Sequence, residues 1–147
     1  LLGSLSFLLL SFLLVYPAVK NLDTATSNFS GLGSQALPAV LIYGLFQTSL
    51  PEELLFRGFL LKRLASRLSF VVANTIQAAL FGLLHGLMFI TVLSWQQTLL
   101  IILCTVGIAA YMGFVNEKKS DGSILASWII HALANVITGT LSAFMLI

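Results

Sequence analysis

The chain has 147 residues, of which 59% are hydrophobic and only 8% are charged. In an ordinary soluble domain roughly a quarter of the residues are charged. This composition therefore excludes an ordinary soluble domain and indicates a membrane protein. The net charge of +2 is too small to indicate nucleic-acid binding. We therefore expect the lipid bilayer, and no nucleic acid, among the partners.

Apolar runs separated by polar residues predict five helices. They cover about residues 4–19, 36–65, 70–93, 97–116 and 123–147. The segment 20–35 is rich in Ser, Thr, Asn and Gly and is typical of an aqueous loop, while 94–97 and 118–123 are typical of short turns. The expected fold class is all-α, a polytopic transmembrane bundle of about five helices.

The chain is expected to form a single transmembrane domain over residues 1–147, as a fragment of a larger bundle. It begins at Leu1 without an initiator Met or a basic leader. The first apolar run therefore resembles a truncated span more than a signal peptide.

Basic residues gather at one level of the predicted bundle. On one side of the predicted bundle lie Lys62, Arg63, Arg67, Lys118 and Lys119, and only Lys20 lies on the opposite side. By the positive-inside tendency, the side with five cations is cytoplasmic.

The first polar cluster inside an apolar run is "EELLFR". On a helix, Glu53 and Arg57 are four residues apart and share a face, while Glu52 is rotated by about 100° and is free to point elsewhere. An alternative is an ordinary helix start, with hydroxyl cap, proline and acids in the first turn. If Pro51 lies inside a helix, it frees the carbonyl of Gln47 and bends the segment.

Two further polar signals follow on later helices. In "FGLLH", His85 follows Phe81 by one turn, and in "HALAN", His131 and Asn135 lie four residues apart on one face. Such residues also serve as hydrogen-bonded core or as polar contacts between membrane helices. An ionisable group at membrane depth is costly, however, and this favours a functional role.

Depth links the three signals. At a rise of about 1.5 Å per residue, Glu52, His85 and His131 fall at a similar level on the cytoplasmic side, which predicts one buried polar site. A carboxylate at low dielectric is a stronger base than one in water, so Glu52 suits a general base, with His85 orienting the same water. His131 and Asn135 then supply hydrogen bonds to an oxyanion, and the whole set indicates a hydrolase.

Other hydrolytic arrangements fit less well. The chain has no G-x-S-x-G nucleophile motif and no H-E-x-x-H zinc motif. Arg57 is expected to hold Glu53 and to stiffen the helix, a supporting role.

The three motifs, in this order on separate apolar helices, resemble the CAAX protease and bacteriocin-processing family of intramembrane glutamic endopeptidases. The resemblance runs from about Pro38 to the C-terminus, and residues 36–147 carry the protease-like motifs. It implies a cavity open to the cytoplasmic side and no metal or other cofactor. Glu52 and His85 would activate water, and the oxyanion site would be His131 with Asn135. Glu53, Arg57 and Phe81 would support these residues.

The resemblance also bears on substrate and location. Its eukaryotic members remove the last three residues of prenylated C-a-a-X proteins, and its bacterial members are linked to bacteriocin maturation or self-immunity. It therefore implies an integral, multi-pass protease of a bacterial or archaeal cell membrane. The substrate would be a membrane-associated peptide or protein, with or without a prenyl group.

Three alternatives remain open at this point. Two histidines and a carboxylate from three helices could bind a divalent metal ion and form a metal-dependent intramembrane protease. The chain could instead be a non-enzymatic bacteriocin-immunity or scaffolding protein. A proton relay or small transporter would also use intramembrane acids and imidazoles, although the inverted pair of broken helices that favours one is not visible.

Overall fold

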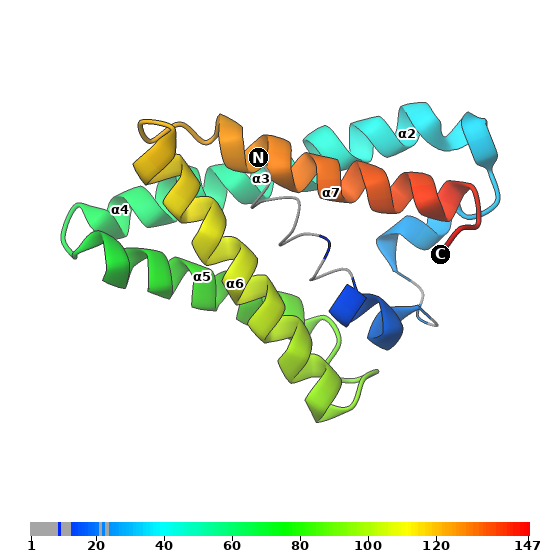
Figure 1. Ribbon diagram of the computed structural model, residues 1–147, viewed down its shortest axis with the longest axis horizontal. Coiled ribbons are helices and arrows are strands. Elements are labelled where there is room, and N and C mark those ends of the chain that lie inside the picture. Colours follow the sequence, from blue (N-terminus) through cyan, green and yellow to red (C-terminus); the bar gives the residue numbers. More distant parts are fainter. Residues whose placement is uncertain (1–8, 10–12, 21, 23) are drawn as a thin grey trace.

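The computed structural model describes residue 9, residues 13–20, residue 22 and residues 24–147, and this part of the chain is helical without any β-strand (Figure 1). The predicted all-α class is confirmed. Residues 9 and 13–19 are helical, whereas the other positions of the predicted 4–19 helix lie outside the described residues.

The predicted 36–65 helix is a continuous helical run over 37–65, but its turns are not uniform. In order it contains α2 (Leu37–Ile42), η3 (Tyr43–Ser49), α3 (Leu50–Glu53), η4 (Leu54–Leu61) and α4 (Lys62–Ala65), of which η3 and η4 are π-helical. Pro51 lies in the first turn of α3. Proline lacks an N–H and its ring crowds the preceding turn of a regular α-helix, so wider π-turns accommodate it. The helix is thus not regular around Pro51, with π-helical turns on both sides of α3, while the predicted bend of the segment stays a prediction.

The remaining helices are α5 (Phe70–Leu87), α6 (Trp95–Lys119) and α7 (Leu125–Ala143). α6 begins two residues earlier than predicted because Ser94 and Gln97 form a capping box at its start. α5 ends at Leu87 rather than at residue 93. The chain then forms tight turns that begin with a hydrogen bond from the Phe89 amide to the Gly86 carbonyl, in a stretch of β-branched residues that disfavour helix.

The helices form two pairs that meet near α4 and diverge away from it (Figure 1). α5 and α6 pack as an antiparallel hairpin, and α7 packs along the 37–65 helix. The α5–α6 contact is close because Gly82 and Gly86 face Ile102 and Val106 of α6. The helix over residues 13–19 lies in the space between α6 and α7.

The 20–35 segment is more ordered than the predicted aqueous loop. It contains two short 3₁₀ helices, η1 (Ala25–Phe29) and η2 (Gly33–Ala36). Phe29 packs edge-on against Tyr43 with ring centroids 5.6 Å apart, and the Ser142 hydroxyl donates to the Thr26 carbonyl over 2.9 Å. Apolar and polar contacts to α7 and η3 therefore hold the segment against the bundle.

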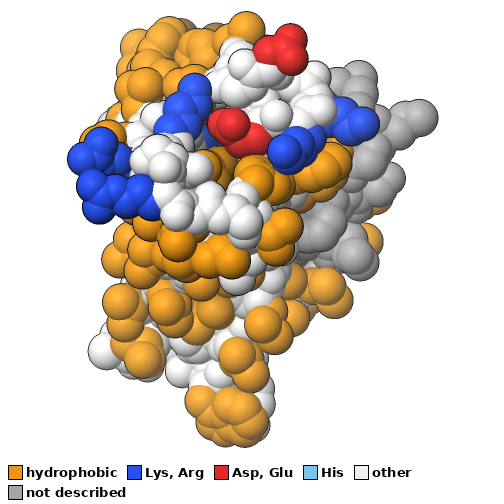
Figure 2. Space-filling view, turned by 90° about the vertical axis from the view of Figure 1, so that its left-hand side faces the viewer, with side chains coloured by type: hydrophobic (Ala, Val, Ile, Leu, Met, Phe, Trp, Pro, Cys, Tyr) orange, Lys and Arg blue, Asp and Glu red, His pale blue; other side chains and the backbone are white. Residues whose placement is uncertain are grey.

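Three of the described helices, α5, α6 and α7, are long and apolar enough to cross a membrane. Their polar ends meet at one face of the molecule, which we call the basic face and define by Lys62, Arg63, Arg67, Lys118 and Lys119. Figure 2 views this end and shows the Lys, Arg and acidic side chains gathered above a broad hydrophobic surface. The predicted clustering of these five cations is present in the structure.

Candidate active site

The two adjacent acids of the 37–65 helix have different surroundings. Glu53 is fully buried, and its Oε1 atom lies 2.9 Å from Nη1 of Arg57, which is also fully buried. The guanidinium carbon of Arg57 lies 4.4 Å from the centroid of the Phe81 ring. Glu52 instead lines a cavity, and 35% of its side chain is exposed. The expected pairing of Glu53 with Arg57 and the separate direction of Glu52 are both observed.

His85 is fixed from one side and open on the other. Its Nδ1 atom lies 2.9 Å from the carbonyl oxygen of Phe81, and its ring lies 4.4 Å from the Phe81 ring between centroids. Because a carbonyl oxygen can only accept, Nδ1 carries a proton. In the neutral ring, Nε2 then has a free lone pair, and this atom lies 4.0 Å from Oε2 of Glu52.

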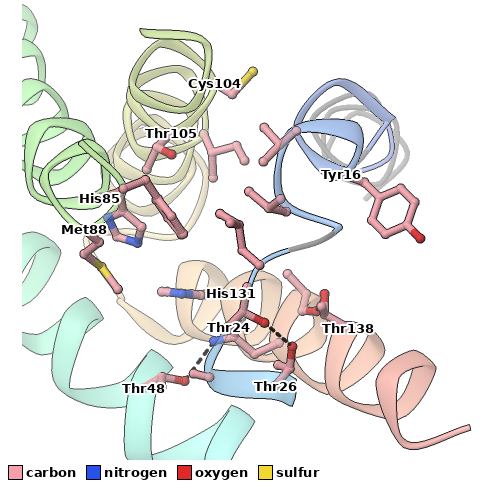
Figure 3. Close-up of a pocket in the computed structure, with 18 of the residues that line it drawn as sticks. Tyr16, Thr24, Thr26, Thr48, His85, Met88, Cys104, Thr105, His131 and Thr138 are labelled. Carbon is pink, nitrogen blue, oxygen red and sulfur yellow. Dashed lines mark hydrogen bonds between the residues drawn. The ribbon is translucent and has the colours of Figure 1, made fainter. Parts of the chain in front are cut away.

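His131 reaches both acids. Its Nδ1 atom lies 3.0 Å from Oε1 of Glu53, and its Nε2 atom lies 3.9 Å from Oε2 of Glu52. The two histidine rings face the same space (Figure 3). Three residues that the sequence placed at similar depth on separate helices, Glu52, His85 and His131, are thus brought together at one oxygen atom.

Asn135 lies on the same face of α7 as His131, but its amide points to other partners. Its Nδ2 atom donates to the hydroxyl oxygens of Thr48, over 2.9 Å, and Ser49, over 3.1 Å. Sequence reasoning treated these two residues only as a possible helix cap. The available signal was their position one turn before Glu52, which places them on its face of the helix.

A cavity of about 790 Å³ extends from this cluster (Figure 3). Its walls are largely apolar, and the hydroxyl groups of Thr and Ser side chains from several elements also line it. The hydroxyl groups belong to Thr24, Thr26, Ser27, Thr48, Thr105, Thr138 and Ser142. An apolar cavity with a few convergent polar groups is the usual form of a ligand site.

The cavity runs away from the basic face. Its lining includes Leu84 and His85 near the end of α5, Cys104 and Thr105 of α6, and Thr138 and Ser142 near the end of α7, and none of the five cations of the basic face. Toward the basic face, a core of Phe56, Ala78, Phe81 and Ala109 closes the space behind Glu52. The resemblance implied a cavity open to the cytoplasmic side, and this orientation stays a prediction.

Among known proteins, the family described as type II CAAX prenyl endopeptidase Rce1-like matches residues 34–137. This is well over half of the chain. The chain belongs to this Rce1-like family.

All residues of the cluster lie inside the part of the chain that the Rce1-like family matches. This is a family of membrane proteases, and the membership together with the three long apolar helices makes the chain an integral membrane protein. No curated protein and no solved structure was found to match the chain. Within the described residues, no group of three or more His, Cys, Asp or Glu side chains is arranged to hold a metal ion.

Proposed function

We propose that the chain carries the active centre of an intramembrane endopeptidase in which Glu52 and His85 activate a water molecule. The observation that carries this proposal is the position of Glu52 Oε2, which lies 4.0 Å from His85 Nε2 and 3.9 Å from His131 Nε2 at the end of a cavity. These gaps are too long for direct hydrogen bonds. They leave this buried oxygen without a hydrogen-bond partner, so it is available to accept a proton from a water molecule that enters with the substrate.

The groups around such a water support a general-base mechanism. The Phe81 carbonyl accepts from His85 Nδ1, so the lone pair on Nε2 can accept a hydrogen bond from one water O–H and orient the water, while Glu52 takes the proton of the other O–H. The water oxygen attacks the scissile carbonyl carbon as its proton passes to Glu52. The C–N bond then breaks as Glu52 returns this proton to the leaving nitrogen.

In this proposal, His131 stabilises the oxyanion. Its Nδ1–H points at Glu53, which the Arg57 guanidinium holds as a charged acceptor. Nε2 can therefore donate to an oxyanion only when the ring carries both protons, and Glu53 is the counter-charge for that form at membrane depth. Glu53 and Arg57 thus act through His131 rather than on the substrate.

The cavity supports a peptide or protein substrate of the membrane. Its apolar walls suit hydrophobic side chains, and the oxygens of its Thr and Ser side chains can accept hydrogen bonds from peptide N–H groups. The cavity does not distinguish a prenyl group from an apolar peptide segment. Both are therefore included in the test.

The test is cleavage of a peptide library, with and without prenyl groups, by the purified protein in detergent. We expect cleavage by the wild type and a loss of about 10²-fold or more in Glu52→Gln, which keeps the side-chain size but removes the base. Glu117→Gln, an acid outside the cluster, is the matched control and retains activity.

The same assay separates the alternatives. Activity that a chelator abolishes and zinc restores would replace this proposal with a metal-dependent protease. A folded wild type that cleaves no peptide, together with a Glu52→Gln variant that still protects cells against a bacteriocin, would indicate an immunity protein.

A further inference from the structure

The π-helical turn before Glu52 is held by side chains. The Thr48 hydroxyl donates to the Tyr43 carbonyl over 3.0 Å, and the Ser49 hydroxyl donates to the Gly44 carbonyl over 2.5 Å. The indole nitrogen of Trp128 donates to the next carbonyl, that of Leu45, over 2.7 Å. Three successive carbonyls of η3 therefore accept a hydrogen bond from a side chain. These bonds compensate for the irregular backbone hydrogen bonding of a π-turn.

These bonds determine which atom of the Asn135 amide faces Thr48 and Ser49. Each hydroxyl has one proton, and in Thr48 and Ser49 it is committed to a backbone carbonyl that can only accept. Their oxygens are then acceptors, and the amide nitrogen of Asn135 donates one N–H to each. A reversed amide would place its oxygen against two oxygens that have no proton to give. Both N–H groups of Asn135 are therefore occupied.

The packing of α7 makes this reach possible. A Cβ atom at Gly44 would lie 2.7 Å from a side-chain carbon of Val136, so only glycine allows α7 this close. Ser49 is fully buried, so its hydroxyl cannot exchange these partners for water.

The network lies one turn from the cluster. Thr48 and Ser49 precede Glu52 by four and three residues, so all three side chains lie on adjoining parts of one helix face. A change in the π-turn would therefore rotate or shift Glu52 relative to His85 and His131. Figure 3 shows Thr48 at the edge of the same cavity as the two histidines.

We infer that Thr48 and Ser49 are positioning residues, which together with Asn135 hold the π-turn that aims Glu52 at His85. This inference rests on the proposed function for its effect on activity. Its structural part, the clamp on η3, stands without it. Nothing in the motif pattern alone assigns a role to Thr48 or Ser49.

The first test is a double-mutant cycle on a peptide that the wild type cleaves. Thr48→Val and Asn135→Leu should each lower kcat by about 10- to 100-fold, since misplacement of a catalytic group by about 1 Å has effects of this size. KM should change little. The double variant should be no slower than Asn135→Leu alone, because both substitutions break the same network. Thr48→Ser keeps the hydroxyl and should restore most of kcat.

Thr98→Val is the matched control. Thr98 is buried on α6, it does not line the cavity, and its hydroxyl has no hydrogen-bond partner, so the substitution should leave kcat near the wild-type value. If Thr48→Val and Ser49→Ala leave kcat unchanged, these hydroxyl groups do not position Glu52 and the inference is wrong.

A second measurement does not depend on activity. Amide hydrogen exchange over residues 43–52 should become faster in Thr48→Val and Asn135→Leu and stay unchanged in Thr98→Val. Unchanged exchange in all three variants would overturn the clamp. If the wild type cleaves no peptide but exchange behaves as expected, the proposed function fails while the clamp stands.

Discussion

The α5–α6 pair and the pair of α7 with the 37–65 helix use similar contacts with different results. In the first pair, Asn74 and Gln77 donate to the Ala110 and Ala109 carbonyls of a regular α-helix, next to Gly113. In the second pair, side chains of α7 bond to a π-helical turn, next to Gly44.

The difference lies in what the contact holds. A regular helix keeps its shape without help, so the amides of α5 mainly add adhesion between helices. A π-turn is less stable, so the contacts from α7 also define its shape and, one turn later, the direction of Glu52. Substitutions in the first pair should therefore change stability alone, while those in the second should change stability and activity together.

The largest expected effect is at the buried ion pair of the second region. Arg57→Leu leaves the Glu53 carboxylate buried without its cation, so we expect a loss of about 3–5 kcal/mol in the free energy of unfolding. The measurement is denaturant unfolding in detergent. Arg63→Leu, on the exposed side of the same helix, is the control and should change stability little. Equal effects of both substitutions would show that the Glu53–Arg57 pair does not stabilise the fold.

A smaller effect is expected at the closest contact of the first region. Gly113→Ala places a methyl group against the Asn74 amide, so we expect a loss of about 1–3 kcal/mol. kcat per folded molecule should not change. Gly58→Ala, whose added carbon would meet only ordinary contacts at 3.7 Å or more, is the control for stability. A lower kcat in Gly113→Ala would contradict the expectation that substitutions in the α5–α6 pair change stability alone.

Trp128→Phe tests one hydrogen bond to the π-turn. The substitution keeps an aromatic ring but leaves the Leu45 carbonyl without its indole donor, so we expect about 1 kcal/mol of destabilisation and a lower kcat. Trp95→Phe is a matched change at a side chain that is 72% exposed. Stability by thermal unfolding and kcat by peptide cleavage would be measured on both. An unchanged kcat in Trp128→Phe would show that this hydrogen bond to the π-turn has no effect on catalysis.

The smallest effect is expected at Gln77. Its Oε1 atom is buried without a hydrogen-bond partner, whereas its Nε2 atom donates to Asn74 and Ala109. Gln77→Leu removes the unsatisfied oxygen together with the two bonds, and these terms offset each other to within about 1 kcal/mol. Thermal unfolding of this variant should match that of Gln96→Leu at an exposed position. A loss much larger than this would mean that the amide bonds dominate the α5–α6 contact.

The sequence was sufficient to predict the helical class and the meeting of the three motifs. Long uncharged runs can only be helical spans in a bilayer, and a fixed rise per residue relates depths on different helices. Glu52, His85 and His131 converge for this reason. The pairing of Glu53 with Arg57 follows equally from their four-residue spacing.

Other features depend on tertiary contacts that spacing does not encode. The π-turn η3 is one, because its Leu45 carbonyl accepts a hydrogen bond from Trp128 of α7, a partner far away in the sequence. The partners of Asn135 depend on how closely Gly44 lets α7 approach, which no local pattern reveals. The order in the 20–35 segment depends on Phe29 packing against Tyr43, and composition alone indicated only a loop.

The most direct test of the central claim is a kinetic cycle on Glu52→Gln and His85→Asn with one cleaved peptide under single-turnover conditions. If both side chains act on one water, each substitution removes most of the rate and the double variant is no slower than the slower single variant. Effects that multiply in the double variant would show that Glu52 and His85 act in separate steps, and they would contradict the shared-water mechanism.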